Sequence, residues 1–168
     1  MPQFKIQQIA LCPKNPTAAI ELLTAMGLKD WAHDHVVALG YVDVCPHEVN
    51  DLRRDTSKPV RNEADLAFNY EGFDEKRELE VLHYTAGENW LAGGEPRVSH
   101  LGMHCTAAEL AEWRKFFDER GIVVAQEVLT WTHTNPVIAG KRWYNYVIFN
   151  TYEILGVDIK FIVRREQP

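Results

Sequence analysis

The feature that most constrains the fold is a pattern that occurs twice along the chain. Residues 4–27 and 98–121 each begin as a strand and continue as a helix with one apolar face. Three stretches rich in β-branched and aromatic residues follow each helix. They lie at 31–42, 66–70 and 79–85 in the first half, and at 123–132, 143–149 and 157–163 in the second. The chain is therefore predicted to contain a βαβββ module twice.

Capping residues mark the ends of both helices. Thr106 and Glu109 have the spacing of a capping box, and Gly121 follows the second helix as a C′ residue. Asn15 precedes a proline at the first helical position, and Gly27 ends the first helix. These signals predict one α+β domain over residues 1–168. Its parts are a module at 1–86, a linker at 87–96 and a second module at 97–168.

Composition and charge limit the classes of function. The net charge is −6 and no arginine-rich run is present, which argues against a nucleic-acid partner. The start of the sequence lacks the apolar region of a signal peptide, and no stretch is apolar for long enough to cross a membrane. Cys12, Cys45 and Cys105 lack metal-finger spacing and are typical of reduced thiols. We expect a cytoplasmic protein with no membrane partner.

Two polar segments interrupt the predicted strands. The segment at about 45–62 is interpreted as a solvent-exposed loop or, alternatively, as a basic cover over an anionic ligand. The shorter segment at about 132–142 lies among aromatic residues. Ordinary strand packing accounts for most of these aromatic side chains, and the mouth of a binding pocket is the alternative. The candidate substrate-binding residues in this region are Trp131, His133, Arg142 and Tyr144.

Strand alternation places several ionisable side chains on shared faces. His100 and His104 point to the same side of the strand that opens the second module, and Asp158 and Lys160 share a face of the last strand. A single histidine is more often a core residue than a ligand. Beside His100, however, His104 is a candidate acid or base, or a group that orients its neighbour.

The chain resembles the vicinal oxygen chelate superfamily, and glyoxalase I within it. The resemblance is carried by the paired modules and by three short motifs. These are Gln-Ile-Ala-Leu at 8–11, Leu-Glu-Val-Leu-His at 79–83 and His-Leu-Gly-Met-His at 100–104. It implies two curved mixed sheets around a shared cavity. It also implies a divalent metal ion (zinc, nickel, iron or manganese) held by Gln8, Glu80 and His100.

The fourth ligand position is where the chain departs from the superfamily. A glutamate is expected there on the last strand, and Lys160 aligns with it. A lysine ammonium is repelled by a dication. In one account Gln8, Glu80 and His100 form an open three-ligand site, with Asp158 or a water molecule completing it. In the other, Lys160 pairs with Glu80 and the cavity binds its ligand without a metal.

The resemblance predicts an enzyme that acts on a small oxygen-rich molecule as a metal-dependent lyase, isomerase or dioxygenase. A metal with open coordination positions stabilises the oxyanion that forms as a proton leaves carbon. The candidate catalytic residues are Lys160, His104 and Asp158. The alternative is a metal-free binding protein of the drug-sequestering, bleomycin-resistance kind. The resemblance also implies pairing of two copies in a homodimer.

Overall fold

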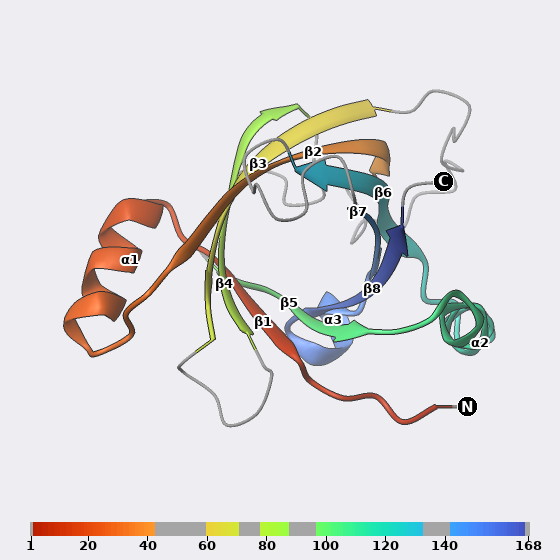
Figure 1. The fold of residues 1–168 in the computed structure, drawn as a ribbon. Coiled ribbons are helices and arrows are strands. Elements are labelled where there is room, and N and C mark those ends of the chain that lie inside the picture. The colour runs from red at the N-terminus through yellow and green to blue at the C-terminus, as the bar shows by residue number, and fades with distance from the viewer. Residues whose placement is uncertain (1, 43–59, 71–77, 88–96, 133–141, 167–168) are drawn as a thin grey trace.

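A computed structural model describes residues 2–42, 60–70, 78–87, 97–132 and 142–166. Its eight described strands close into one barrel (Figure 1). The elements in chain order are β1 (Gln8–Cys12), α1 (Pro16–Ala25), β2 (Ala32–Val42), β3 (Val60–Asn69), β4 (Glu78–Gly87), β5 (Arg97–His104), α2 (Ala107–Asp118), β6 (Val124–Thr132), β7 (Arg142–Phe149), α3 (Tyr152–Leu155) and β8 (Asp158–Glu166). The predicted pair of βαβββ modules is confirmed.

The two modules are joined along two seams. β1 pairs antiparallel with β5, and β2 pairs antiparallel with β6. Within each module the last strand runs parallel to the first, so that β4 lies beside β1 and β8 lies beside β5. The strand order around the barrel is therefore β1-β4-β3-β2-β6-β7-β8-β5. Both modules line a single interior, as the sequence predicts.

The barrel has an apolar cluster inside and an aromatic layer outside. The inner cluster consists of Cys12, Val36, Ala64, Leu66, Leu82, Ala125 and Ile148. The outer layer lies where α2 covers the second module, and Trp113 stacks there on Phe161 with ring centroids 5.3 Å apart. Burial of such large rings is a main source of folding free energy.

The two helices begin as predicted but pack differently. The Thr106 hydroxyl accepts a hydrogen bond from the Glu109 amide at 3.2 Å, and the Glu109 carboxylate accepts one from the Thr106 amide at 2.8 Å. At α1, Asn15 Oδ1 accepts a hydrogen bond from the Ala18 amide at 3.0 Å. α2 buries Leu110, Trp113 and Phe117, whereas α1 buries no residue and projects from the barrel (Figure 1).

Two elements differ from the sequence prediction. β3 begins at Val60, although only residues 66–70 were expected, so the strand includes the end of the predicted polar segment. The short helix α3 was not predicted. Its start is held by Asp158 Oδ1, which accepts hydrogen bonds from the amides of Thr151 at 3.0 Å and Tyr152 at 3.1 Å. Residues 43–59, 88–96 and 133–141 lie outside the description, and with them most of both loops and of the linker.

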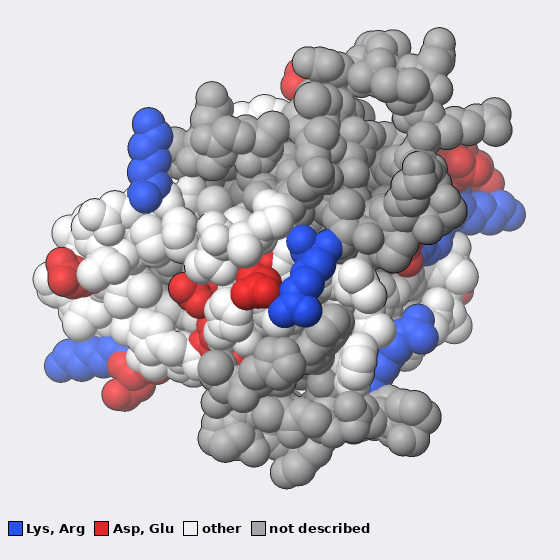
Figure 2. Space-filling view, turned by 90° about the horizontal axis from the view of Figure 1, so that it is seen from above, with Lys and Arg blue, Asp and Glu red and all other residues white. Residues whose placement is uncertain are grey.

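The described surface has no dominant charge of one sign on the face seen from above. Acidic and basic side chains are scattered there among uncharged residues (Figure 2). None of the helices in the described ranges has both the length and the apolar character needed to cross a membrane.

Candidate functional site

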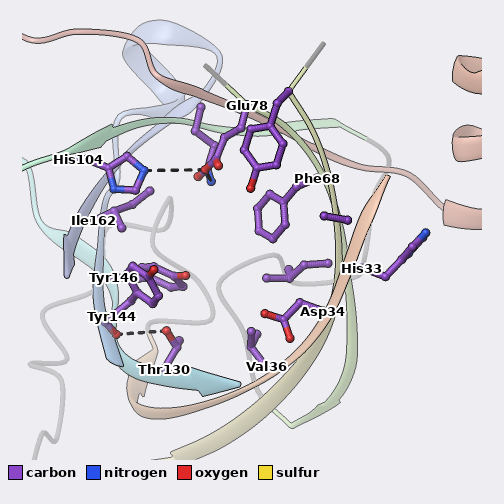
Figure 3. A pocket seen from close by; sticks show the side chains of 14 residues that line it. His33, Asp34, Val36, Phe68, Glu78, His104, Thr130, Tyr144, Tyr146 and Ile162 are labelled. Carbon is purple, nitrogen blue, oxygen red and sulfur yellow. Dashed lines mark hydrogen bonds and ion pairs between the residues drawn. The ribbon is translucent and has the colours of Figure 1, made fainter. Parts of the chain in front are cut away.

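The barrel encloses a cavity of about 130 Å³ whose wall comes from both modules. Glu78 and His104 lie at one end of it, and Asp34 and Thr130 lie at the other (Figure 3). Phe68, Tyr144 and Tyr146 form aromatic walls between the two ends (Figure 3). The cavity is therefore apolar along its sides and polar at its ends, which is typical of small-molecule sites.

A second chamber of about 30 Å³ continues from the first. The two share Val36, Leu66, Thr130 and Tyr146 in their walls. A chamber of this size has room for one or two water molecules. Its polar wall includes Glu80, His100, Gln126 and Lys160. Ionisable groups therefore line both chambers: Asp34, Glu78 and His104 the larger one, and Glu80, His100 and Lys160 the smaller one.

The three predicted metal ligands converge in this interior. His100 Nε2 lies 2.8 Å from Gln8 Oε1 and 3.2 Å from Glu80 Oε2. The three residues are at most 3% exposed. Strand register explains why these three side chains lie together. Ala10 on β1 pairs with both Glu80 and His100, and Gln8 lies on the same face of β1 two residues away.

Gly102 makes the approach of Gln8 possible. The two residues are paired across the β1–β5 seam. A Cβ atom on Gly102 would lie 2.9 Å from Gln8 Oε1 and 3.0 Å from Gln8 Cβ. A larger residue would therefore push the glutamine side chain away from His100.

His100 is held as a neutral imidazole. Its burial and the nearby Lys160 ammonium lower the pKa of His100 to about 4. The Ser99 hydroxyl lies 2.8 Å from Nδ1. With Nε2–H donating to Gln8 Oε1 and Nδ1 accepting from Ser99, both ring nitrogens have partners.

Glu78 and His104 form an acid–base pair that opens to the larger cavity. Glu78 Oε1 accepts a hydrogen bond from Gln8 Nε2 and lies 4.0 Å from His104 Nε2. Burial, together with the charge of Glu80, raises the pKa of Glu78 to about 7. Burial and the Lys160 charge lower the pKa of His104. At neutral pH the carboxyl group can therefore gain or lose a proton beside a neutral imidazole.

Lys160 lies in the same polar interior. Its Nζ is 3.8 Å from Glu80 Oε2 and 4.1 Å from the centroid of the Tyr146 ring. Burial lowers the pKa of Lys160, and the charge of Glu80 opposes that shift. Burial also disfavours charge on Glu80, but Lys160 and His100 hold the pKa of Glu80 below its ordinary value. We therefore assign a carboxylate and an ammonium to this pair.

Comparison with known proteins shows likeness at the level of fold. No protein-family model and no curated protein sequence matches the chain. A Streptomyces coelicolor methylmalonyl-CoA epimerase in complex with 2-nitronate-propionyl-CoA superimposes with a TM-score of 0.53 at 18% identity, covering 99% of this chain and 100% of that one. A methylmalonyl-CoA epimerase in complex with methylmalonyl-CoA and NH4+ gives 0.51 at 16% identity, with the same coverage. A hypothetical protein from Bacillus halodurans gives 0.50 at 16% identity, covering 98% of this chain and 96% of that one.

The chain therefore has the same fold as these methylmalonyl-CoA epimerases. The family resemblance seen in the sequence implies a metal ion, so the donor set must be tested for one. The observed separations of 2.8 and 3.2 Å suit ligands of one ion, because metal–ligand bonds of about 2.1 Å place neighbouring ligands roughly 3 Å apart. The separations of Gln8, Glu80 and His100 are therefore compatible with ligands of one metal ion.

The charge of the site is not right for that metal. An ion bound to Glu80 Oε2 would lie roughly 4 Å from the Lys160 ammonium, where a dication is repelled by about 8 kcal/mol at an effective dielectric constant of about 20. Structural zinc sites in small peptides gain about 10–16 kcal/mol in total, so this repulsion would remove roughly half or more of that gain. With Lys160 charged, the residues present do not fit a divalent metal.

The other predicted site residues are placed as follows. Asp158 is buried and holds the start of α3, and it belongs to the wall of neither cavity. Tyr144 lines the larger cavity and stacks on Tyr146 with centroids 6.0 Å apart. Trp131 and Arg142 belong to β6 and β7, but their side chains lie outside the description, as does the whole of His133.

The residue that sequence reasoning did not select is Glu78. Its signal is the alternation of Glu78 and Glu80, which places both carboxyl groups on the inner face of β4. The superfamily resemblance draws attention to Glu80 as a ligand and offers no role for Glu78. Its neighbours, Gln8 on the adjacent strand β1 and His104 on β5 of the other module, become visible only in the folded barrel.

Proposed function

We propose that this protein is an enzyme that moves a proton at a carbon atom next to a carbonyl group of a small oxygen-rich molecule. The reaction is of the isomerase or epimerase type. The observation that supports it is geometric. Glu78 and His104 face one another, 4.0 Å apart, at one end of a cavity with aromatic walls (Figure 3). A carboxylate beside a neutral imidazole is a common arrangement for proton transfer.

Glu78 is the proposed base. Gln8 fixes one of its oxygens by a hydrogen bond, so the carboxylate has a defined direction at the cavity wall. In the reaction the carboxylate takes the proton from carbon, and the electron pair of the C–H bond moves to the carbonyl oxygen as an enolate. Return of the proton by Glu78 to the neighbouring carbon gives an isomer, and rotation of the enolate in the cavity before Glu78 returns the proton gives the epimer. A carboxyl group with a pKa near 7 is suited to both directions.

His104 is the proposed partner that stabilises the enolate. Its imidazole is neutral and can donate a hydrogen bond to the oxygen on which negative charge develops. The side chain of His104 is 47% exposed, and the rings of Phe68, Tyr144 and Tyr146 form the cavity wall beside it. The chemistry therefore uses only this chain's own side chains.

The test is exchange of the substrate's carbon-bound proton with deuterated water, followed by NMR. Methylmalonyl-CoA is the first probe, because two structures of similar fold are named as its epimerase. The hemithioacetal of methylglyoxal and glutathione is the second. We expect exchange with wild type and a rate roughly 10²–10⁴-fold lower with Glu78→Gln. Glu119→Gln, a matched change at the exposed end of α2, should leave the rate unchanged.

A metal-free binding protein is the second candidate function. The aromatic cavity walls and the Lys160–Glu80 pair favour it. Calorimetry with bleomycin, a cationic aromatic drug, would then show tight binding, and no probe would exchange its proton. Exchange without drug binding supports the enzyme, and drug binding without exchange supports the binding protein.

Two further sequence predictions stay predictions. They are a cytoplasmic location and a homodimer. Light scattering coupled to gel filtration would measure the mass of the protein in solution and so test the second.

A further inference from the structure

We infer that the Lys160 ammonium takes the place of the metal ion in this barrel. The native protein then binds no metal ion at this site. Residue 160 determines whether the positive charge of the site comes from a lysine side chain or from a bound metal ion. The inference concerns the buried polar chamber and does not depend on the proton transfer proposed for Glu78.

Strand register shows that Lys160 occupies the position equivalent to Glu80. Across the seam of the two modules, Gln8 pairs with Gly102 and Ala10 pairs with His100. When one module is matched to the other, this antiparallel pairing makes Gln8 correspond to His100 and Ala10 correspond to Gly102.

The same correspondence between modules holds for their last strands, β4 and β8. Glu80 on β4 lies beside Ala10, and Lys160 on β8 lies beside Gly102. The four positions Gln8, Glu80, His100 and Lys160 thus form two equivalent pairs. Three of them carry groups that can bind a metal, and the fourth carries a cation.

Contacts around Lys160 show that its ammonium is held inside the site. Nζ lies 3.8 Å from Glu80 Oε2, the same oxygen that lies 3.2 Å from His100 Nε2. Nζ also lies 4.1 Å from the centroid of the Tyr146 ring, which is a typical distance for a cation–π interaction. Lys160 is 4% exposed, so the ammonium cannot reach solvent without leaving Glu80 uncompensated. It balances the buried carboxylate as a metal ion would.

The experiment replaces the cation by a ligand. Wild type, Lys160→Glu and Lys160→Met are treated with a chelator, freed of it, and titrated with Zn²⁺ by calorimetry and with Co²⁺ by absorption spectroscopy. Lys160→Met is the matched control, because it removes the ammonium and adds no oxygen ligand. We expect no His100-dependent binding by wild type, and binding by Lys160→Glu roughly 10- to 100-fold tighter than by Lys160→Met. Adding His100→Ala to Lys160→Glu should abolish that gain.

Folding of the variants is measured together with binding. Without metal, Lys160→Glu places two carboxyl groups side by side, so its melting temperature should fall and should rise again when Zn²⁺ is added. Lys160→His is the second variant, since a neutral ligand avoids the carboxylate repulsion. Stoichiometric, His100-dependent metal binding by wild type would overturn the inference. So would folded Lys160→Glu and Lys160→His variants that bind metal no better than Lys160→Met.

Discussion

At the scale of single residues, an ionic cluster lies on the outer face of the first module. His35 Nδ1 is 2.8 Å from Asp65 Oδ1, and Nε2 is 3.3 Å from Glu63 Oε2. The two carboxylates lie on β3 beside β2, so register brings them to the same histidine. The hydrogen bond to Asp65, aided by Glu63, raises the pKa of His35, and partial burial opposes the shift.

This cluster predicts a pH-dependent contribution to stability. Because the folded pKa of His35 is raised, the folded chain binds the proton more tightly than the unfolded chain. The stabilisation is fully present below the unfolded value of about 6.5 and is lost as pH rises through the folded pKa. His35→Gln should therefore lower the free energy of unfolding more at pH 5.5 than at pH 8.5. Urea denaturation at both pH values measures this, and an equal loss at the two would contradict it.

At the scale of elements, α1 and α2 have equivalent places in the two modules but unequal roles. α2 buries Leu110 to 5% exposure, and it packs against the barrel through its aromatic side chains. α1 buries none of its side chains, and Leu22 is 63% exposed. Stability should therefore depend on α2 far more than on α1.

Two identical substitutions test this difference between the helices. Leu110→Ala removes buried apolar volume and should lower the free energy of unfolding by about 2–5 kcal/mol. Leu22→Ala removes an exposed side chain and should change it by less than about 0.5 kcal/mol. Denaturation in urea compares the two variants. A loss at Leu22 as large as that at Leu110 would mean that α1 is buried in solution.

At the scale of the whole molecule, the barrel depends on contacts between modules. The β1–β5 and β2–β6 seams each join one module to the other, and the cavity wall includes strands of both. A separated module would expose strand edges at both seams. We expect neither residues 1–87 nor residues 97–168 to form a folded monomer.

Mixing the two fragments should restore the barrel, because the seams can form between separate chains. Circular dichroism and gel filtration with light scattering would follow the recovery of strand structure and of a complex of both fragments. A single fragment that unfolds cooperatively as a monomer would show instead that each module is a domain by itself.

The sequence by itself determined the type and order of the main elements. Capping at Thr106 and Asn15 and the period of the apolar residues are local properties, and the helices begin where these residues place them. The paired modules and the resemblance also placed Gln8, Glu80 and His100 together, and the structure shows the three side chains in contact. The length of β3 was missed because strand pairing is not local. The helix α3 was missed because its start depends on the side chain of Asp158, six to seven residues further along the chain.

Only the tertiary structure decided how the site is charged. The sequence left open whether Lys160 excludes a metal or a metal binds beside it, since that depends on the distance from Nζ to Glu80. It offered no role for Glu78, because the pKa of a carboxyl group is set by burial and by neighbours from other strands. Closure of the barrel removes water from these groups and brings strands from both modules within a few ångströms. Desolvation and long-range contact are properties of the folded chain, and they determine the chemistry of its interior.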